Sequence, residues 1–184
     1  MARVIKPSEL RGRGTVALAR WLLGKALVRT LDSQRSRWLI TEVEAYDGEN
    51  DQACHASKGR TARTEVMYQA GGIWYVYLCY GVHEMLNLVT GPAGYPAAVL
   101  IRGVHGISGP GRLTRRLQID RRLNGQPARP SSGLHLEDSG LEIPRRLLQA
   151  GRRVGVDYAG PVWAGKPWRF YFAAEDFAAR VGDL

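Results

Sequence analysis

Two carboxylates and a phenol alternate along one short segment of the chain. Residues 41–46 read TEVEAY, and the two-residue period of a strand would place Glu42, Glu44 and Tyr46 on one face, with the Cα atoms of the two glutamates about 6.6 Å apart. A carboxylate held in this way can act as a general base or stabilise a developing positive charge. An E-x-E pattern is more often a solvated strand face, so the rest of the sequence must decide between these interpretations.

Aromatic residues dominate a second segment, residues 73–80, which read IWYVYLCY. As a strand, it would carry Tyr75 and Tyr77 on one face and Trp74 on the other, where Trp74 is expected to fill the core. Tyr80 and Gly81 follow where the chain must turn. A ring at a hairpin tip could act as a wedge between base steps, and tyrosines in a nearby polar pocket could sandwich an extruded base.

The elements that would position these residues are mostly short strands separated by turn residues. Glycine, proline and polar turn signals between the strands favour an antiparallel sheet, and the predicted class is α+β, with one domain over residues 1–184. We expect strands at 26–30, 38–46, 73–80, 85–90, 97–104 and 167–172, helices at 16–23, 112–117 and 141–148, a hairpin near 73–90 and a surface loop near 123–140.

Net charge indicates the kind of partner. The 184 residues carry a formal charge of +9, and 22 of the 26 basic residues are arginines, whose planar side chain pairs with phosphate through two hydrogen bonds. A charge excess of this size favours nucleic acid as the partner, while the ordinary apolar content excludes disorder and fibres. The apolar stretch 16–28 is too short and too interrupted for a membrane span, and the two cysteines fit a reduced cytoplasm.

The usual cofactor and metal motifs fail in this sequence. Residues 160–166 fit the first seven positions of a phosphate-binding loop, but Pro167 replaces the hydroxyl residue that would bind magnesium. The four histidines show no metal-ligand spacing, and no zinc deaminase or zinc protease motif is present. We therefore expect neither a metal nor a cofactor.

An ordered set of motifs makes the chain recognisable. They are EVEAY (42–46), CH (54–55), GRT (59–61), YVYLCYG (75–81), LN (86–87), VLIR (99–102), SGP (108–110), RVGV (153–156) and KPWRFY (166–171). In order and spacing, the set resembles the alkyladenine (3-methyladenine) DNA glycosylase family, bacterial relatives of the vertebrate alkylpurine DNA glycosylase. The resemblance runs from about residue 18 to residue 172, and implies a curved sheet flanked by helices with a protruding hairpin that inserts into DNA.

The resemblance implies excision of damaged purines from double-stranded DNA by hydrolysis of the N-glycosidic bond. Glu44 is similar to the family's catalytic carboxylate, the general base for water, and its charge would also stabilise an oxocarbenium-like sugar. Arg102 resembles the residue that holds Glu44 and the water in place, a role compatible with an ordinary salt bridge. Glu42, by contrast, is interpreted as structural, with an electrostatic role as the alternative.

Further positions match the family's base-binding and DNA-binding residues. Tyr46, His55 and Tyr77 match the positions that enclose the flipped base, where an aromatic face attracts a cationic purine by about 0.5–2 kcal/mol. Asn87 matches the position that excludes undamaged guanine, although it could equally cap a strand end. Tyr80 resembles the intercalating residue that fills the vacated gap through the minor groove.

Few lysines and three departures from the family pattern bear on the outcome of the reaction. A glycosylase that also cleaves the backbone needs an amine nucleophile, and the nearest lysine, Lys58, has no catalytic part in the family. We therefore expect a monofunctional enzyme without lyase activity.

Three residues depart from the family pattern. Ala62 replaces a usual proline, Thr64 replaces a frequent asparagine, and Glu84 places an acidic side chain in a segment expected to approach DNA, so the affinity for DNA and the range of substrates are expected to depend on them.

Two other functions stay open. A catalytically silent minor-groove protein could use Tyr80 as a wedge, and a metal-dependent nuclease could be built on Glu42 and Glu44. For the glycosylase we expect a monomer without an obligate protein partner or membrane contact, in the cytoplasm and acting at the bacterial nucleoid. The sequence leaves open the preferred lesion among 3-methyladenine, 7-methylguanine, hypoxanthine and etheno adducts.

Overall fold

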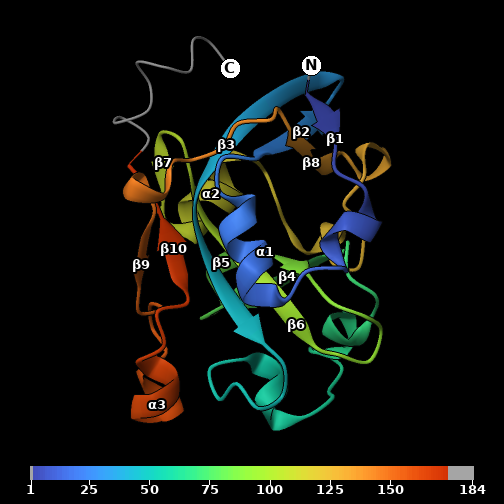
Figure 1. Ribbon diagram of the computed structural model, residues 1–184. Helices are drawn as coiled ribbons and strands as arrows, with labels where there is room; N and C mark the ends of the chain where they lie inside the picture. The colour runs from blue at the N-terminus through green and yellow to red at the C-terminus, as the bar shows by residue number, and fades with distance from the viewer. Residues whose placement is uncertain (1, 174–184) are drawn as a thin grey trace.

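The strands pair with one another in one curved sheet (Figure 1). The computed structural model describes residues 2–173, and every strand pair in that range is antiparallel. The main strands, in spatial order, are β1 (Arg3–Val4), β8 (Leu134–Asp138), β2 (Ala26–Leu31), β3 (Gln34–Asp47), β6 (Ala97–Val104), β5 (His83–Val89) and β4 (Trp74–Cys79). Of the short strands, β7 (Ile107–Ser108) pairs with β6, β10 (Arg169–Tyr171) pairs with β3, and β9 (Gln149–Gly151) pairs with β10.

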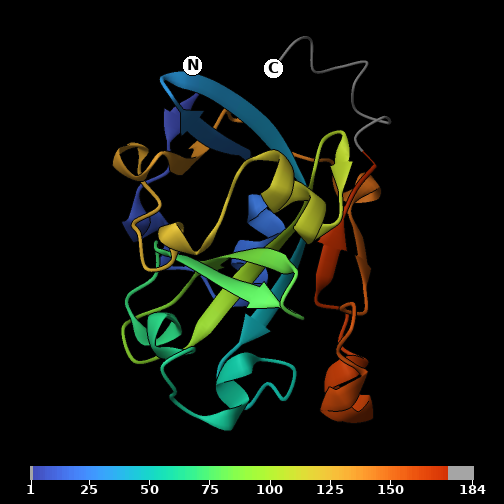
Figure 2. The same ribbon diagram turned by 180° about the vertical axis from the view of Figure 1, so that it is seen from behind.

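Three short helices accompany the sheet in the described range. The helix α1 (Thr15–Leu22) packs against β3 and β6, and α2 (Pro110–Arg116) packs against β5 and β6. The helix α3 (Gly160–Ala164) lies beyond the ends of β9 and β10 in both views (Figures 1 and 2). The predicted α+β class, with a curved, mainly antiparallel sheet and flanking helices in one domain, is confirmed. Among the described helices, none combines the length and apolar character needed to cross a bilayer.

Apolar periodicity explains how α1 and the sheet meet. Leu18, Ala19 and Leu22 lie on one side of the helix and are fully buried, and they share a core cluster with apolar residues of β3 and β6. Trp74 is also fully buried in this cluster, as expected, and its indole N–H donates to the carbonyl of Leu134 at 2.9 Å. Because its N–H has a hydrogen-bond partner, the large indole ring of Trp74 can be buried in an apolar core without an unsatisfied polar group.

The long strand β3 bends where the sheet is irregular. Its pairing with β6 shifts register between Ile40 and Glu42 and again between Glu42 and Val43, as at a β-bulge. Beyond the bend, β3 has β6 on one side and β10 on the other, so Glu44 lies opposite both Leu100 and Arg169. The bend and the double pairing place the carboxylate of Glu44 inside the protein rather than on a sheet edge.

Several sequence-based boundaries were wrong. Residues 123–140, expected to form a surface loop, contain β8, in which Leu134 and Leu136 are fully buried between β1 and β2. The glycine, proline and serine residues before β8 favoured a loop, so this short strand of alternating apolar and polar residues was not predicted. Residues 141–148, expected to be a helix, contain only a 3-10 turn at Arg145–Leu147, and α1, expected at 16–23, spans Thr15–Leu22 with Gly14 as its N-cap.

Candidate active site

Glu44 is a fully buried carboxylate with a hydrogen-bond donor on each oxygen. The backbone N–H of Val154 donates to Oε1, and the hydroxyl of Tyr46 donates to Oε2, both at 2.8 Å. The exposed fraction of the Glu44 side chain is zero. A carboxylate with both oxygens engaged by protein groups has its orientation fixed before any ligand binds.

Two arginines share the acidic cluster at the bend of β3. Nε of Arg102, on β6, lies 3.0 Å from Oε1 of Glu42 and 3.4 Å from Oε1 of Glu44, and Nη1 of Arg169 lies 3.3 Å from Oε1 of Glu42. The structure thus brings Arg102 to Glu44, but its closer partner is Glu42. Two guanidinium groups beside these two carboxylates also leave a poor environment for a divalent metal, which the nuclease hypothesis requires.

Opposing effects act on the protonation of Glu44. Burial raises the pKa of Glu44, while the charge of Arg102 and the hydrogen bonds from Val154 and Tyr46 oppose this by favouring the ionised form. Burial, followed by the nearby charge of Glu44, raises the pKa of Tyr46 well above its usual value. Tyr46 is therefore a neutral donor throughout the physiological range.

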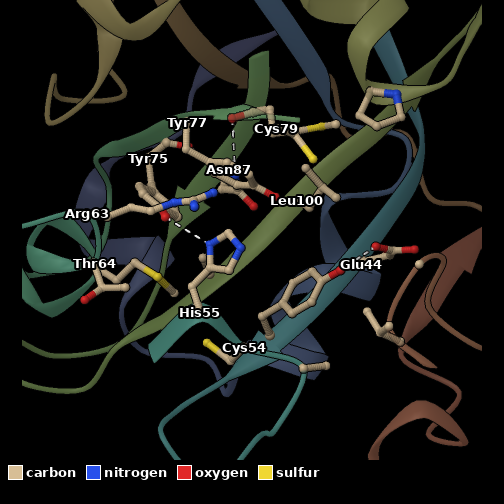
Figure 3. A pocket seen from close by; sticks show the side chains of 18 of the residues that line it. Glu44, Cys54, His55, Arg63, Thr64, Tyr75, Tyr77, Cys79, Asn87 and Leu100 are labelled. Carbon is tan, nitrogen blue, oxygen red and sulfur yellow. Dashed lines mark hydrogen bonds between the residues drawn. The ribbon is translucent and has the colours of Figure 1, made fainter. Parts of the chain in front are cut away.

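Aromatic rings form one wall of a pocket beside Glu44 (Figure 3). Nδ1 of His55, which begins the 3-10 helix His55–Lys58, lies 3.0 Å from the hydroxyl of Tyr75. The rings of His55 and Tyr77 meet edge to face with centroids 4.6 Å apart, and those of Tyr75 and Tyr77 lie 5.3 Å apart. Two neighbouring rings and one hydrogen bond therefore hold His55 in place.

The histidine in this wall is neutral at physiological pH. Burial lowers the pKa of His55 to about 4, and the nearby charges of Arg63 and Lys58 act in the same direction. Figure 3 shows the Arg63 side chain reaching from its loop toward this wall, and its guanidinium lies 4.8 Å from the centre of the Tyr77 ring. A neutral His55 presents an uncharged ring face, and of its two ring nitrogens one donates and the other accepts a hydrogen bond.

Asn87 lies within β5 and is 4% exposed. Its side-chain amide donates to the carbonyl of Tyr75 at 3.1 Å and to that of Met85 at 3.3 Å. The residue is paired with Tyr75 and Leu100 in the sheet, which rules out the strand-end cap. The two contacts fix the orientation of an amide that lines the same pocket as Glu44.

Tyr80 occupies the tip of the β4–β5 hairpin. Its side chain is 92% exposed, and both Tyr80 and Gly81 have positive φ angles, 50° and 69°. Two consecutive positive φ angles are typical of a tight hairpin turn, which the N–H of Val82 closes on the carbonyl of Cys79 at 3.1 Å. Glycine accepts this conformation freely and tyrosine adopts it rarely. The turn thus presents a large ring to solvent at one rim of the pocket.

All seven predicted residues border one cavity of about 810 Å³, which lies in the size range of small-molecule sites. They come from β3, β4, β5, β6, the β4–β5 turn and the 3-10 helix His55–Lys58, and they are Glu44, Tyr46, His55, Tyr77, Tyr80, Asn87 and Arg102. Within residues 2–173, no three histidine, cysteine, aspartate or glutamate side chains gather as a metal site would require.

Comparison with known proteins identifies the family. The family model described as "Methylpurine-DNA glycosylase (MPG)" matches residues 9–108 and 105–176. The chain belongs to this family. The matched range 9–108 contains all seven predicted site residues, and the resemblance that the motifs indicated is confirmed.

Three relatives of this glycosylase family are similar over most of their length, and each is named "Putative 3-methyladenine DNA glycosylase". The protein from Methanocella arvoryzae is 46% identical, over 91% of this chain and 92% of its own. The protein from Psychrobacter cryohalolentis is 44% identical, over 87% and 88%, and that from an Anaeromyxobacter species is 42% identical, over 94% and 91%.

Sequence reasoning missed several groups of this glycosylase-family site. Val154 contributes a backbone N–H, which no side-chain pattern could reveal, although RVGV was among the motifs that carried the resemblance. Tyr75 is the hydrogen-bond partner of His55, and Tyr158 borders the cavity from the C-terminal segment, its hydroxyl donating to the carbonyl of Ala53 at 3.0 Å. The alternation of residues 73–80 placed Tyr75 on the same face as Tyr77, which indicated part of this arrangement. No sequence pattern indicated that Tyr158 would border the cavity.

Proposed function

We propose that this protein is a monofunctional DNA glycosylase of base excision repair. It flips a damaged purine out of duplex DNA, hydrolyses the N-glycosidic bond and leaves an abasic site. The observation that carries the proposal is the fully buried carboxylate of Glu44, held by two donors beside a pocket with aromatic walls. Membership of the methylpurine-DNA glycosylase family and the names of its relatives support alkylated purines as substrates.

In this mechanism, a water molecule attacks C1′ of the deoxyribose as the bond to the purine nitrogen breaks. Glu44 takes one proton from the water, the sugar keeps the hydroxyl group, and the purine leaves with the bonding electrons. The negative charge of Glu44 also stabilises the oxocarbenium character of the sugar in the transition state. Arg102 favours the ionised form of Glu44 that both roles need.

The charge of the purine sets how much help its departure needs. A cationic alkylpurine such as 3-methyladenine leaves as a neutral base, whereas a neutral purine such as hypoxanthine must gain a proton from a general acid. The rings of Tyr46, His55 and Tyr77 enclose the flipped base and attract a cationic one by about 0.5–2 kcal/mol. Asn87 excludes undamaged guanine by contact with its exocyclic amine.

On the DNA, the exposed ring of Tyr80 enters the minor groove and fills the gap left by the flipped nucleotide. The excess of arginine supplies the electrostatic attraction to phosphate.

A catalytically silent minor-groove protein would also need Tyr80, but it would not need a carboxylate buried at zero exposure, because burying that charge costs free energy. The enzyme acts as a monomer on DNA at the nucleoid.

Water rather than an amine is the nucleophile. Lys58 is exposed and borders the cavity, so it is the lysine to test for a Schiff base with C1′. We expect borohydride to trap no covalent complex with lesion-bearing DNA. A trapped complex that disappears in Lys58→Gln would show a lyase activity and contradict the monofunctional assignment.

The deciding experiment is release of free base from duplexes that each carry one lesion: 3-methyladenine, 7-methylguanine, hypoxanthine or ethenoadenine. The wild-type protein should release at least one base without added metal. Glu44→Gln should lower the single-turnover rate by about 10²–10⁴-fold and keep DNA affinity, since it removes the general base and retains the side-chain shape. Release at an undiminished rate would refute the role of Glu44. No release from any duplex would favour the silent DNA-binding protein.

A further inference from the structure

Arg153 is a buried cation with no role in the mechanism above. Both its side chain and that of Asp51 have zero exposure. Nη1 of Arg153 donates to Oδ2 of Asp51 at 2.5 Å, and Nη2 donates to Oδ1 at 2.8 Å. A two-point contact of this kind fixes the plane of the guanidinium as well as compensating its charge.

The remaining N–H groups of the two terminal nitrogens reach backbone carbonyls on two different elements, while Nε is buried without a hydrogen-bond partner. Nη1 also donates to the carbonyl of Ala45 on β3 at 2.8 Å, and Nη2 donates to that of Trp163 in α3 at 3.2 Å. The guanidinium packs against the rings of Tyr46 and Trp168, with centroids 4.8 and 5.1 Å away. One side chain therefore ties β3 to the C-terminal segment.

These contacts converge on Glu44 from both sides. Ala45, whose carbonyl accepts from Arg153, directly follows Glu44, and Tyr46, whose ring packs on the guanidinium, donates its hydroxyl to Oε2. Val154 directly follows Arg153, and its N–H donates to Oε1. Both hydrogen-bond donors of Glu44 thus depend on where Arg153 lies.

We propose that Arg153 is a positioning residue, which holds the Tyr46 hydroxyl and the Val154 amide against the two oxygens of Glu44. As a statement about catalysis, this rests on the proposed hydrolysis. Asp51 compensates the charge of Arg153 at contact distance, while the charges of Arg153 and Glu44 also attract each other, so a variant that keeps the cation, Arg153→Lys, separates a geometric effect on Glu44 from an electrostatic one. Asp51 also accepts from the N–H of Ala53 at 3.1 Å, which connects the same ion pair to the loop that leads to His55.

The test replaces the ion pair by a neutral pair of similar shape, Asp51→Asn with Arg153→Gln, because removal of one partner alone would leave a buried charge. Arg153→Lys is the second variant, which keeps the charge but cannot make the same set of contacts. The control is Lys25→Gln with Asp138→Asn. Lys25 and Asp138 form another largely buried pair at 2.8 Å, 6% and 13% exposed, and neither borders the cavity.

Two measurements separate positioning from general stability. The first is the pH dependence of single-turnover base release, and the second is titration of the Glu44 carboxyl by ¹³C NMR without DNA, assigned with Glu44→Gln. The other charged or titratable groups that face Glu44 are unchanged in the neutral pair. They are Glu42 and Tyr46 on β3, Arg102 on β6 and Arg169 on β10.

Loss of well-placed donors disfavours the ionised carboxylate, so the acid limb of the rate profile should move up by about one pH unit or more, and the NMR midpoint should move with it. The maximal single-turnover rate should fall about tenfold or more, with the half-saturating protein concentration little changed. Arg153→Lys should give an intermediate result, and the control should melt earlier without either shift.

An NMR midpoint and an acid limb that match those of wild type in both Arg153 variants would overturn the inference. So would equal shifts in the control pair, because the effect would then follow stability alone. If wild-type protein releases no base, the proposed function fails, while the NMR titration still decides whether Arg153 positions the donors of Glu44.

Discussion

Tyr46→Phe tests the role of a single hydrogen bond at Glu44. The substitution removes the donor on Oε2, 2.8 Å away, and keeps the ring that borders the pocket. A hydrogen bond to a charged group is worth about 1.5–3 kcal/mol, and 1.36 kcal/mol corresponds to one pKa unit. Since this bond favours the ionised form, its loss should raise the pKa of Glu44 and move the acid limb of base release up by about one to two pH units.

The assay is single-turnover release of a damaged base between pH 5 and 9, followed by chromatography of the free base. Above the shifted limb, the rate of Tyr46→Phe should recover most of the wild-type value, and DNA affinity should not change. Tyr77→Phe is the matched control, since in the described part of the chain the Tyr77 hydroxyl makes no hydrogen bond to Glu44. An unshifted limb in Tyr46→Phe, or the same shift in Tyr77→Phe, would refute the reasoning.

Three further outcomes are expected. Tyr80→Ala should change the free energy of unfolding by less than about 0.5 kcal/mol relative to wild type, because the ring is 92% exposed. It should nevertheless lower the affinity for lesion-bearing duplexes and the 2-aminopurine signal of base flipping. An unchanged flipping signal would exclude the wedge role of Tyr80. His55 binds its proton more weakly in the folded protein, where its pKa is about 4, than in the unfolded chain. The free energy of unfolding should therefore fall by roughly 2–3 kcal/mol as the pH drops from 6.5 to 4. Denaturant melts of His55→Gln should lack this part of the decrease. Asp51→Asn alone should destabilise the protein by about 3–5 kcal/mol, because it leaves Arg153 buried without its counter-charge, and thermal melts that match wild type would contradict that burial.

Local patterns predicted the parts of the site that lie on one strand. The alternation of Glu42, Glu44 and Tyr46 indicated a common face, and in the structure Arg102 reaches both carboxylates while Tyr46 donates to one of them. The β4 alternation likewise brought Tyr75 and Tyr77 together. A strand period of two is a strong constraint, so residues two apart share a face wherever the strand runs regularly.

Contacts between distant parts of the chain escaped sequence reasoning. The N–H of Val154 donates to a carboxylate 110 residues earlier, and the Asp51–Arg153 pair spans 102 residues. Nothing local distinguishes Arg153 from the solvated arginines around it, because its burial depends on the pairing of β10 with β3 and on the carbonyl that Trp163 of α3 offers. The strand β8 was missed for a related reason: its buried His135 and Glu137 read as polar residues of a loop.

The double pairing of β3 implies an uneven distribution of rigidity around the cavity. Amide groups near Glu44 are engaged by neighbours on both sides, so exposure of this part should require opening on the scale of the whole domain, and hydrogen exchange there should be among the slowest in the protein. The 48–68 loop, which carries His55, contains only short 3-10 helices, and its fixed points are the buried Asp51–Arg153 pair and the contacts of His55 with Tyr75 and Tyr77. If the proposed function holds, variation in which bases are accepted should accumulate at the exposed loop positions that border the cavity, Lys58, Thr61 and Arg63, while the strands that hold Glu44 stay unchanged.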